Sequence, residues 1–179
     1  MISTTLSEAV LSKYLAPYFF ETGTADGCAV ELALRLGFEK VFTVEINPEL
    51  HARNSLRFKQ HIDEGRLHMF LGDTLFVMPQ VIEQLIDKRC TFWLDAHVDH
   101  GPSGVLRCPL LLELECIKKK AMLKHNILID DRRMFGKWWG EGISEELVVR
   151  KILEIDNDYL FKAEDGYVPN DIIAAWLPT

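Results

Sequence analysis

The sequence has few cysteines, and their spacing excludes the common cysteine-based sites. Its four cysteines stand apart at Cys28, Cys90, Cys108 and Cys116, with no C-x-x-C pair. A free thiol among apolar neighbours packs as a small hydrophobic side chain. Because disulfides are rare in the cytosol, we expect these thiols to be reduced and structural.

Long apolar runs and a targeting segment are also missing. No hydrophobic stretch approaches the roughly 20 residues that a membrane-spanning helix needs. The first residues, Met1 to Val10, do not follow the charged-then-apolar order of a signal peptide. We therefore expect a cytoplasmic protein with no membrane partner.

Basic residues are too few for a general nucleic-acid binder. The chain has 20 Lys and Arg against 27 Asp and Glu, which gives a net charge of −7. Binding to phosphates needs clustered cations, so a nucleic-acid partner is not expected. The sequence also has no linker, repeat or low-complexity tract. We predict one domain over residues 1–179, with an N-terminal helical segment at 1–17.

Short apolar runs alternate with longer amphipathic segments, which is typical of a parallel sheet covered by helices. The predicted strands are Tyr18–Thr22, Lys40–Ile46, Leu67–Leu71, Cys90–Leu94, Asn126–Ile129, Tyr159–Ala163 and Asp171–Leu177. The predicted helices are Asp26–Leu36, Pro48–Ile62, Leu75–Asp87, Val105–Lys124 and Ser144–Ile155, with a further helix expected within Leu6–Pro17. The last two strands are too close for a helix between them, so they must pair antiparallel. The predicted fold is α/β, a Rossmann-like, doubly wound, seven-stranded and mostly parallel sheet with an antiparallel C-terminal hairpin strand.

A glycine-bearing turn, Glu21-Thr-Gly23-Thr-Ala-Asp26-Gly27, follows the first strand and opens the first helix. Ligands of open α/β sheets bind outside the carboxyl ends of the strands, where this turn falls. A dinucleotide fingerprint needs three glycines, and Asp26 would repel a pyrophosphate. A cofactor with a sulfonium and an ammonium group suits Glu21 and Asp26 better. The alternative is a tight turn without a ligand.

These segments resemble the class I S-adenosylmethionine (SAM)-dependent methyltransferases over nearly the whole chain. The glycine turn resembles their first motif, Val44-Glu45-Ile46-Asn47-Pro48 their acidic second-strand end, and Leu71-Gly72-Asp73-Thr74 their third-strand motif. The resemblance implies that SAM is bound by Glu21, Gly23, Thr24, Glu45, Ile46, Gly72, Asp73, Thr74 and Asp95. Of these, Glu21 and Gly23 would line the methionine part, Glu45 the ribose, and residues 72–74 the adenine. One departure is Ala25, which stands where the more familiar motif has a second glycine.

Carboxylates follow the fourth and fifth predicted strands. Asp95 ends the first of these strands, and Asp130 and Asp131 end the second, so all three should meet at one rim of the sheet. Grouped carboxylates repel one another unless they are protonated or joined by a cation, and oxygen ligands favour Mg²⁺ or a similar divalent metal. Alternatively, Asp130 or Asp131 faces water. The arrangement resembles the macrocin O-methyltransferase type, which implies a metal held by these residues and bound to hydroxyls of the acceptor.

The resemblance implies methyl transfer to a hydroxyl of a small-molecule acceptor. A metal lowers the pKa of such a hydroxyl, and a nearby histidine can remove its proton. We expect His97 first and His100 second as that base, beside Asp95. Either histidine could instead hydrogen-bond its own loop.

Two other functions stay open. Asp95-Ala-His97-Val-Asp99 also resembles the D-A-H-x-D metal segment of arginase-like hydrolases, although the chain is short for that fold and a spaced D-x-D partner is missing. A SAM-binding protein without catalysis is the second alternative, and a homodimer is compatible with the sequence.

The segment after the fifth strand also allows two readings. Trp138 and Trp139 could form a lid over an acceptor or pack at an interface. The preceding Arg132 and Arg133 could bind an anionic acceptor or pair with nearby carboxylates.

Overall fold

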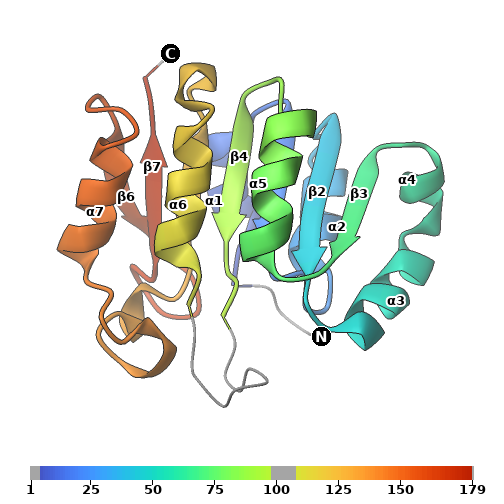
Figure 1. Cartoon of the computed structure of the whole chain (residues 1–179), viewed down its shortest axis with the longest axis horizontal. Helices are drawn as coiled ribbons and strands as arrows, with labels where there is room; N and C mark the ends of the chain where they lie inside the picture. Colours follow the sequence, from blue (N-terminus) through green and yellow to red (C-terminus); the bar gives the residue numbers. More distant parts are fainter. Residues whose placement is uncertain (1–4, 98–107, 179) are drawn as a thin grey trace.

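A central seven-stranded sheet organises the molecule (Figure 1). The computed structural model describes residues 5–97 and 108–178. The strands are β1 Tyr18–Thr22, β2 Lys40–Glu45, β3 Leu67–Leu71, β4 Cys90–Leu94, β5 Asn126–Ile129, β6 Leu160–Glu164 and β7 Ile172–Trp176, in the spatial order β3-β2-β1-β4-β5-β7-β6. Strands β1 to β5 pair in parallel, while β7 runs antiparallel to both β5 and β6. The predicted fold class is confirmed.

Helices cover both faces of this sheet. They are α1 Glu8–Leu11, α2 Cys28–Arg35, α3 Pro48–Arg57, α4 Lys59–Asp63, α5 Thr74–Leu85, α6 Leu110–Lys118 and α7 Glu145–Leu153, with 3₁₀ helices at Ser12–Tyr14, Ala121–Leu123, Arg132–Met134 and Trp138–Gly140. Helices α5, α6 and α7 lie in front of the sheet in Figure 1 and share one buried cluster with it. The second cluster joins the sheet to α1, α2 and the start of α4.

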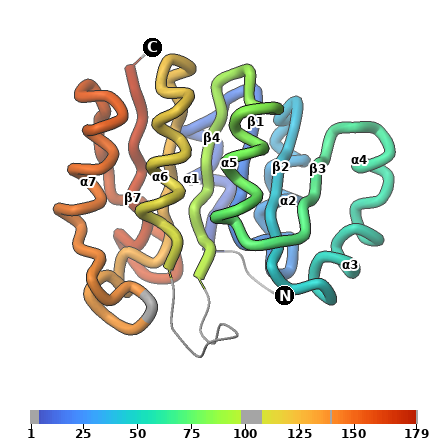
Figure 2. Tube along the Cα trace, viewed as in Figure 1, coloured from blue at the N-terminus to red at the C-terminus, as the bar shows by residue number. Residues whose placement is uncertain are grey.

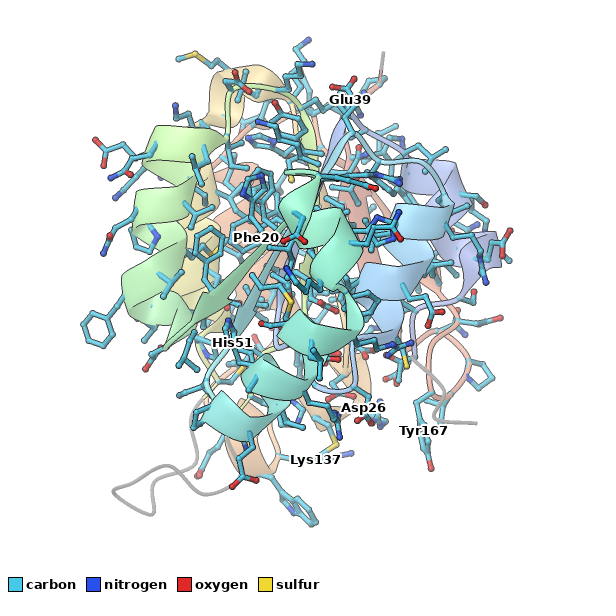
Figure 3. The ribbon with its side chains drawn as sticks, turned by 90° about the vertical axis from the view of Figure 1, so that its right-hand side faces the viewer. Phe20, Asp26, Glu39, His51, Lys137 and Tyr167 are labelled. Carbon is cyan, nitrogen blue, oxygen red and sulfur yellow. The ribbon has the colours of Figure 1, made fainter. Side chains whose placement is uncertain are left out.

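Burial on both faces explains the apolar strands. All five residues of β1 and of β4 are buried, and Figure 3 shows Phe20 of β1 between the layers. The chain reverses its winding between β1 and β4, since β2 and β3 lie on one side of β1 and β4 on the other. Such a switch point leaves a crevice at the carboxyl ends of the strands.

Polar caps begin the helices that leave this end of the sheet. The Asn47 side chain accepts hydrogen bonds from two backbone N–H groups of α3, and Pro48 takes the first turn, where its missing N–H costs nothing. Asp73 caps α5 and Ser144 caps α7 in the same way.

Two predicted helices are shorter than expected. The helix predicted over Pro48–Ile62 is interrupted at Phe58, whose backbone leaves the helical region while its side chain becomes buried. The helix predicted over Val105–Lys124 begins at Leu110, because Pro109 disfavours a helical conformation at the preceding residue. It ends at Lys118 and is followed by a separate 3₁₀ turn. The remaining predicted boundaries hold within two residues, apart from the N-terminal segment.

The N-terminal segment forms two short helical turns instead of one helix over Leu6–Pro17. Its apolar side chains Leu6, Val10 and Leu11 are buried against the sheet in the second cluster. Among the described residues, no helix is both long and apolar enough to cross a membrane.

Candidate functional site

A cleft opens at the carboxyl ends of β1 to β4, at the lower end of the sheet in Figure 1. It holds about 830 Å³ of empty space, counting the part open to solvent. The predicted cofactor residues that line it are Gly23, Glu45, Ile46, Gly72, Asp73, Thr74 and Asp95. The sequence therefore identified most of the cleft wall.

The glycine turn requires glycine at Gly23. This residue has φ +86°, and a Cβ there would lie 3.2 Å from the carbonyl oxygen of Asp95. Its N–H donates to the carbonyl oxygen of Val44 over 3.0 Å. Ala25, which departs from the more familiar motif, has φ 47° and so also lies in the left-handed region. The loop thus keeps a conformation that favours glycine at this position as well.

Glu45 connects two loops around the cleft. Its Oε2 atom accepts a hydrogen bond from the backbone N–H of Ala25 over 2.8 Å, and its Oε1 atom accepts one from Asn47 over 2.8 Å. Both contacts hold the buried carboxylate in a fixed orientation where it lines the cleft. Each oxygen keeps a further lone pair for a hydroxyl donor.

Glu21 and Thr24 lie beneath the turn and do not line the cleft. The Thr43 hydroxyl donates to Glu21 over 2.8 Å and lies 2.6 Å from the Thr24 hydroxyl. Burial raises the pKa of Glu21 to about 8, against the lowering effect of the Thr43 hydrogen bond, and the nearby Glu45 raises it further. These two residues support the turn from below.

Asp26 does not face the cleft as expected. Its carboxylate forms an ion pair with Arg53 at the surface, and Arg57 donates to its backbone carbonyl over 2.7 Å. Asp26 is not among the residues that line the cleft, and Arg53 pairs with its carboxylate, so its predicted attraction of a cationic cofactor stays a prediction.

The third-strand turn closes the other side of the cleft. The N–H of Gly72 donates to the carbonyl oxygen of Glu45 over 2.9 Å, and Asp73 caps α5 by accepting from Leu75. The Thr74 hydroxyl donates to Glu113 over 2.9 Å. This turn is thereby tied both to β2 and to α6.

A second, smaller pocket adjoins the cleft and shares Asp95, Ala96 and His97 with it. It holds about 350 Å³ of empty space, again counting the part open to solvent. Its acidic lining residues are Asp95, Glu113, Asp130 and Asp131. We name it the acidic pocket. Burial is the main cause that raises the pKa of Asp95 well above its usual range and that of Asp130 to about 6, with neighbouring carboxylates adding to both shifts.

The predicted metal ligands fall into two overlapping groups. Asp95, His97 and Asp131 offer ligand atoms within 4.8 Å of one another, and so do Asp130, Asp131 and Asp171. Asp131 belongs to both groups. Asp95 belongs only to the first group and Asp130 only to the second. The Nδ1 atom of His97 lies 3.8 Å from Oδ2 of Asp131.

Asp130 carries an unsatisfied atom suited to a cation. The residue is 5% exposed, its Oδ2 atom accepts from the Thr5 hydroxyl, and its Oδ1 atom has no hydrogen-bond partner among the described residues. A buried carboxylate oxygen without a donor is costly, and a bound cation would remove that cost. The carboxylate and imidazole set fits a hard divalent ion.

Three contributors to this region were not predicted from the sequence. Glu113 is one of two acidic residues in the otherwise mostly apolar helix α6, and it is buried. An acidic residue within an apolar helical segment is the sequence feature that could have identified it. Thr5 and Asp171 reach Asp130 and Arg133 from opposite ends of the chain, which no local pattern reveals.

Arg132 and Arg133 pair with carboxylates. Arg132 forms an ion pair with Glu145 over 2.8 Å. Arg133 pairs with Asp171 and lies 2.6 Å from Oδ1 of Asp131, while its guanidinium stacks on Tyr167. These ion pairs hold the segment between β5 and α7 at the lower end of the sheet, as Figure 2 shows. Its Trp138 is 71% exposed.

Two predicted residues, His100 and Asp99, lie outside the described residues. Their suggested roles stay predictions. His97 lines both the cleft and the acidic pocket, so it has the placement expected of the first candidate base.

Comparison with known proteins decides the fold family. No protein-family model and no curated protein matches the sequence. Among solved structures, an O-methyltransferase from Bacillus cereus in complex with S-adenosylhomocysteine (SAH) is similar, with TM-score 0.61 and 14% identity over 96% of this chain and 78% of that chain. The chain has the class I methyltransferase fold.

Further structures agree with this class I methyltransferase fold. The O-methyltransferase TomG from Streptomyces achromogenes, solved with SAM, gives TM-score 0.57 and 12% identity over 96% of this chain and 78% of that chain. A putative methyltransferase from Streptococcus mutans, solved with SAH, gives TM-score 0.60 and 16% identity. The match covers 98% of this chain and 99% of that chain. The resemblance inferred from the motifs is confirmed at the level of fold.

Proposed function

We propose that this protein is a SAM-dependent methyltransferase that transfers a methyl group to a hydroxyl of a small molecule. The observation that carries the proposal is the junction of two adjacent cavities. The larger cleft has the motif residues at its wall, and Asp95, Ala96 and His97 separate it from the acidic pocket. A cofactor in the first cavity and an acceptor in the second would meet at this junction, and alignment of reacting atoms is most of what a displacement needs.

The chain's own residues orient the cofactor. When bound, SAM supplies a methyl group whose bond to sulfur breaks as its bond to the acceptor oxygen forms, while the acceptor hydroxyl loses its proton. Glu45, fixed by the N–H groups of Ala25 and Asn47, can accept hydrogen bonds from the ribose hydroxyls. The turn at residues 72–74 lines the side of the cleft proposed for the adenine.

The acceptor side needs a proton acceptor and a means of positioning the oxygen. His97 lies at the junction and can take the proton of the hydroxyl. Asp95 and Asp131, with Asp130 adjacent, would hold a divalent ion, which would lower the pKa of a bound hydroxyl while the His97 imidazole takes the proton.

Titration calorimetry with SAH tests the cofactor half of this proposal. We expect SAH to bind, and NAD⁺ to bind far more weakly because the turn lacks the third glycine of a dinucleotide site. Release of SAH from SAM in the presence of hydroxylated acceptors then tests the transfer. Tight NAD⁺ binding without SAH binding would contradict the proposal.

No comparison favours the two alternatives. The arginase-like reading uses Asp95, His97 and Asp99, and the structural neighbours do not point to a metallohydrolase. A SAM-binding protein without catalysis would bind SAH but release none from SAM with any acceptor, so the same two assays distinguish it.

A further inference from the structure

A pocket of a different character lies at the opposite end of the sheet from the cleft. It holds about 670 Å³ of empty space, counting the part open to solvent, and Arg89, Asn126 and Trp176 are among its lining residues. Arg89 and Asn126 stand at the amino ends of β4 and β5, and Trp176 ends the antiparallel β7. The pocket therefore lies at the upper end of the sheet in Figure 1. We name it the basic pocket.

The charge of the basic pocket is positive. Its lining includes Lys13 and Arg89, and neither Asp nor Glu among the residues that the structure describes. Lys13 pairs with Glu164 over 2.7 Å, but Glu164 also pairs with Lys162 over 3.0 Å, so one carboxylate serves two cations. Within the described part of the chain, Arg89 forms no ion pair. Because a guanidinium stays protonated in proteins, this charge persists in a chain whose net charge is −7.

The Arg89 guanidinium has donors that lack an acceptor. Its Nη2 atom donates to Oδ1 of Asn126 over 2.7 Å. Its Nε atom is shielded from solvent and has no hydrogen-bond partner among the described residues. A guanidinium carries five N–H donors in one plane, and a buried donor without an acceptor is costly. A carboxylate or phosphate group is the acceptor that matches this planar arrangement.

A buried network holds Arg89 in position. Asn126 is 2% exposed, and its Nδ2 atom donates to the carbonyl oxygen of Tyr14 over 2.8 Å and to the Thr91 hydroxyl over 3.1 Å. These contacts turn the Oδ1 atom of Asn126 toward Arg89. The guanidinium is thus oriented before any ligand arrives, which reduces the entropy that binding costs.

Apolar side chains form another part of the wall. Tyr14 and Trp176 both line the basic pocket, and the centroids of their rings lie 5.6 Å apart. Leu15 lines it as well and is 49% exposed. A few polar groups beside an apolar wall are typical of a site for a small organic molecule.

We propose that the basic pocket binds a small organic oxyanion, a phosphate monoester or a carboxylate joined to an apolar group. Arg89 is its main anion contact and Lys13 the second, and Tyr14, Leu15 and Trp176 receive the apolar group. The basic pocket shares no lining residue with the cleft or with the acidic pocket, so this inference does not rest on the proposed function.

Matched benzene derivatives test this inference by calorimetry. The full chain is titrated with phenyl phosphate, benzoate and the neutral benzamide. We expect each anion to bind at least about tenfold more tightly than benzamide, because only the anions satisfy the guanidinium. Phenyl phosphate should also bind more tightly than inorganic phosphate, because its ring contacts the apolar wall. Saturating SAH should leave these affinities unchanged, since the cleft lies at the other end of the sheet.

Variants locate the bound anion. Arg89→Gln should weaken phenyl phosphate binding by about tenfold or more, and Arg89→Lys, which keeps the charge without the planar donors, should retain part of the affinity. The control is Arg150→Gln, an exposed arginine of α7 outside the pocket, which should bind as the wild type does. The wild-type series tests the charge preference even if Arg89→Gln does not fold.

Vesicles of equimolar phosphatidylcholine and phosphatidate distinguish a lipid headgroup from a soluble ligand. Binding to these vesicles without binding to phenyl phosphate would overturn the assignment to a small molecule.

Four further results would overturn the inference. They are binding of benzamide as tight as that of the anions, no binding of either anion at millimolar concentration, unchanged affinity in folded Arg89→Gln protein, and competition between phenyl phosphate and SAH. Failure of the protein to bind SAH contradicts the proposed function alone.

Discussion

Glu45 illustrates how one side chain can organise a binding site. Its two oxygen atoms accept from backbone N–H groups on different loops, so the carboxylate fixes the glycine turn and the start of α3 at the same time. Glu21 lies beneath the same turn and does not line the cleft. It is buried, burial raises its pKa to about 8, and the Thr43 hydroxyl donates a hydrogen bond to it.

Replacing Glu45 by Gln should weaken SAH binding by about tenfold to a hundredfold. The amide has only one acceptor oxygen, so one of the two loop N–H groups would lose its charged partner. Calorimetry measures the loss, and Glu49→Gln, an exposed side chain of α3, is the matched control. Unchanged affinity in the Glu45 variant would argue against its place in the cofactor site.

Glu21 should make the protein less stable as the pH rises. Its pKa is about 8 when folded against the ordinary value of 4.5, so between these values the folded state holds a proton that the unfolded state releases. The stabilising contribution is complete below pH 4.5, falls by up to about 1.4 kcal/mol per pH unit between pH 4.5 and about 8, and is lost above that pH.

Urea unfolding across this pH range checks the sign and the size of the effect. Glu21→Gln should flatten the fall in the free energy of unfolding, whereas Glu83→Gln, on the exposed face of α5, should leave it in place. An equally steep fall in the Glu21 variant would assign the effect to other groups.

At the scale of elements, the break between α3 and α4 is coupled to the glycine turn. Gly27 precedes α2 with φ +75°, and Phe58 and Asn54 pack directly against it. Asn54 also donates to the carbonyl oxygen of Ala25 over 2.8 Å. The segment predicted as one helix is divided into α3 and α4 at Phe58, whose side chain packs against Gly27 of the glycine turn.

Gly27→Ala should therefore destabilise the protein by about 2–4 kcal/mol, the sum of backbone strain and overpacking. The added Cβ would lie 2.7 Å from Asn54 Oδ1 and 2.7 Å from Phe58 Cε2. Gly37→Ala is the control, because Gly37 has φ +87° but no heavy atom within 4 Å of a new Cβ. Denaturation should show a clearly larger loss for Gly27, and equal losses would mean that Asn54 and Phe58 yield easily.

At the scale of the whole molecule, distant parts of the chain meet at the acidic pocket. Thr5 comes from the N-terminal segment, Asp130 from the end of β5, and Asp171 from the start of β7. Arg133 joins the last of these to Asp131. The group of Asp130, Asp131 and Asp171 therefore forms only when the antiparallel β7 lies beside β5.

Removal of divalent ions should reduce methyl transfer at least about tenfold, because the hydroxyl would lose the group that lowers its pKa. Asp130→Asn should weaken Mg²⁺ binding while leaving SAH affinity nearly unchanged, since Asp130 does not line the cofactor cleft. The exposed Asp158→Asn is the control. Full activity in excess chelator would remove the metal from the proposal.

The sequence by itself determined the strands and the motif positions of the cleft. Strands β1, β3, β4 and β5 match their predicted bounds. For β1, β4 and β5 the reason is that short apolar runs buried on both faces leave little freedom in where a strand begins and ends. Gly23, Glu45 and residues 72–74 were identifiable because each ends a strand or follows one directly, and parallel strands bring those ends together.

Only the tertiary structure decided which charges face the site. Asp26 is adjacent to the predicted cofactor turn in sequence but is paired with Arg53 at the surface, whereas Glu113 is remote in sequence and lines the acidic pocket. The physical reason is that side-chain direction and ion pairing depend on neighbours from other elements. Local patterns carry no information about those neighbours.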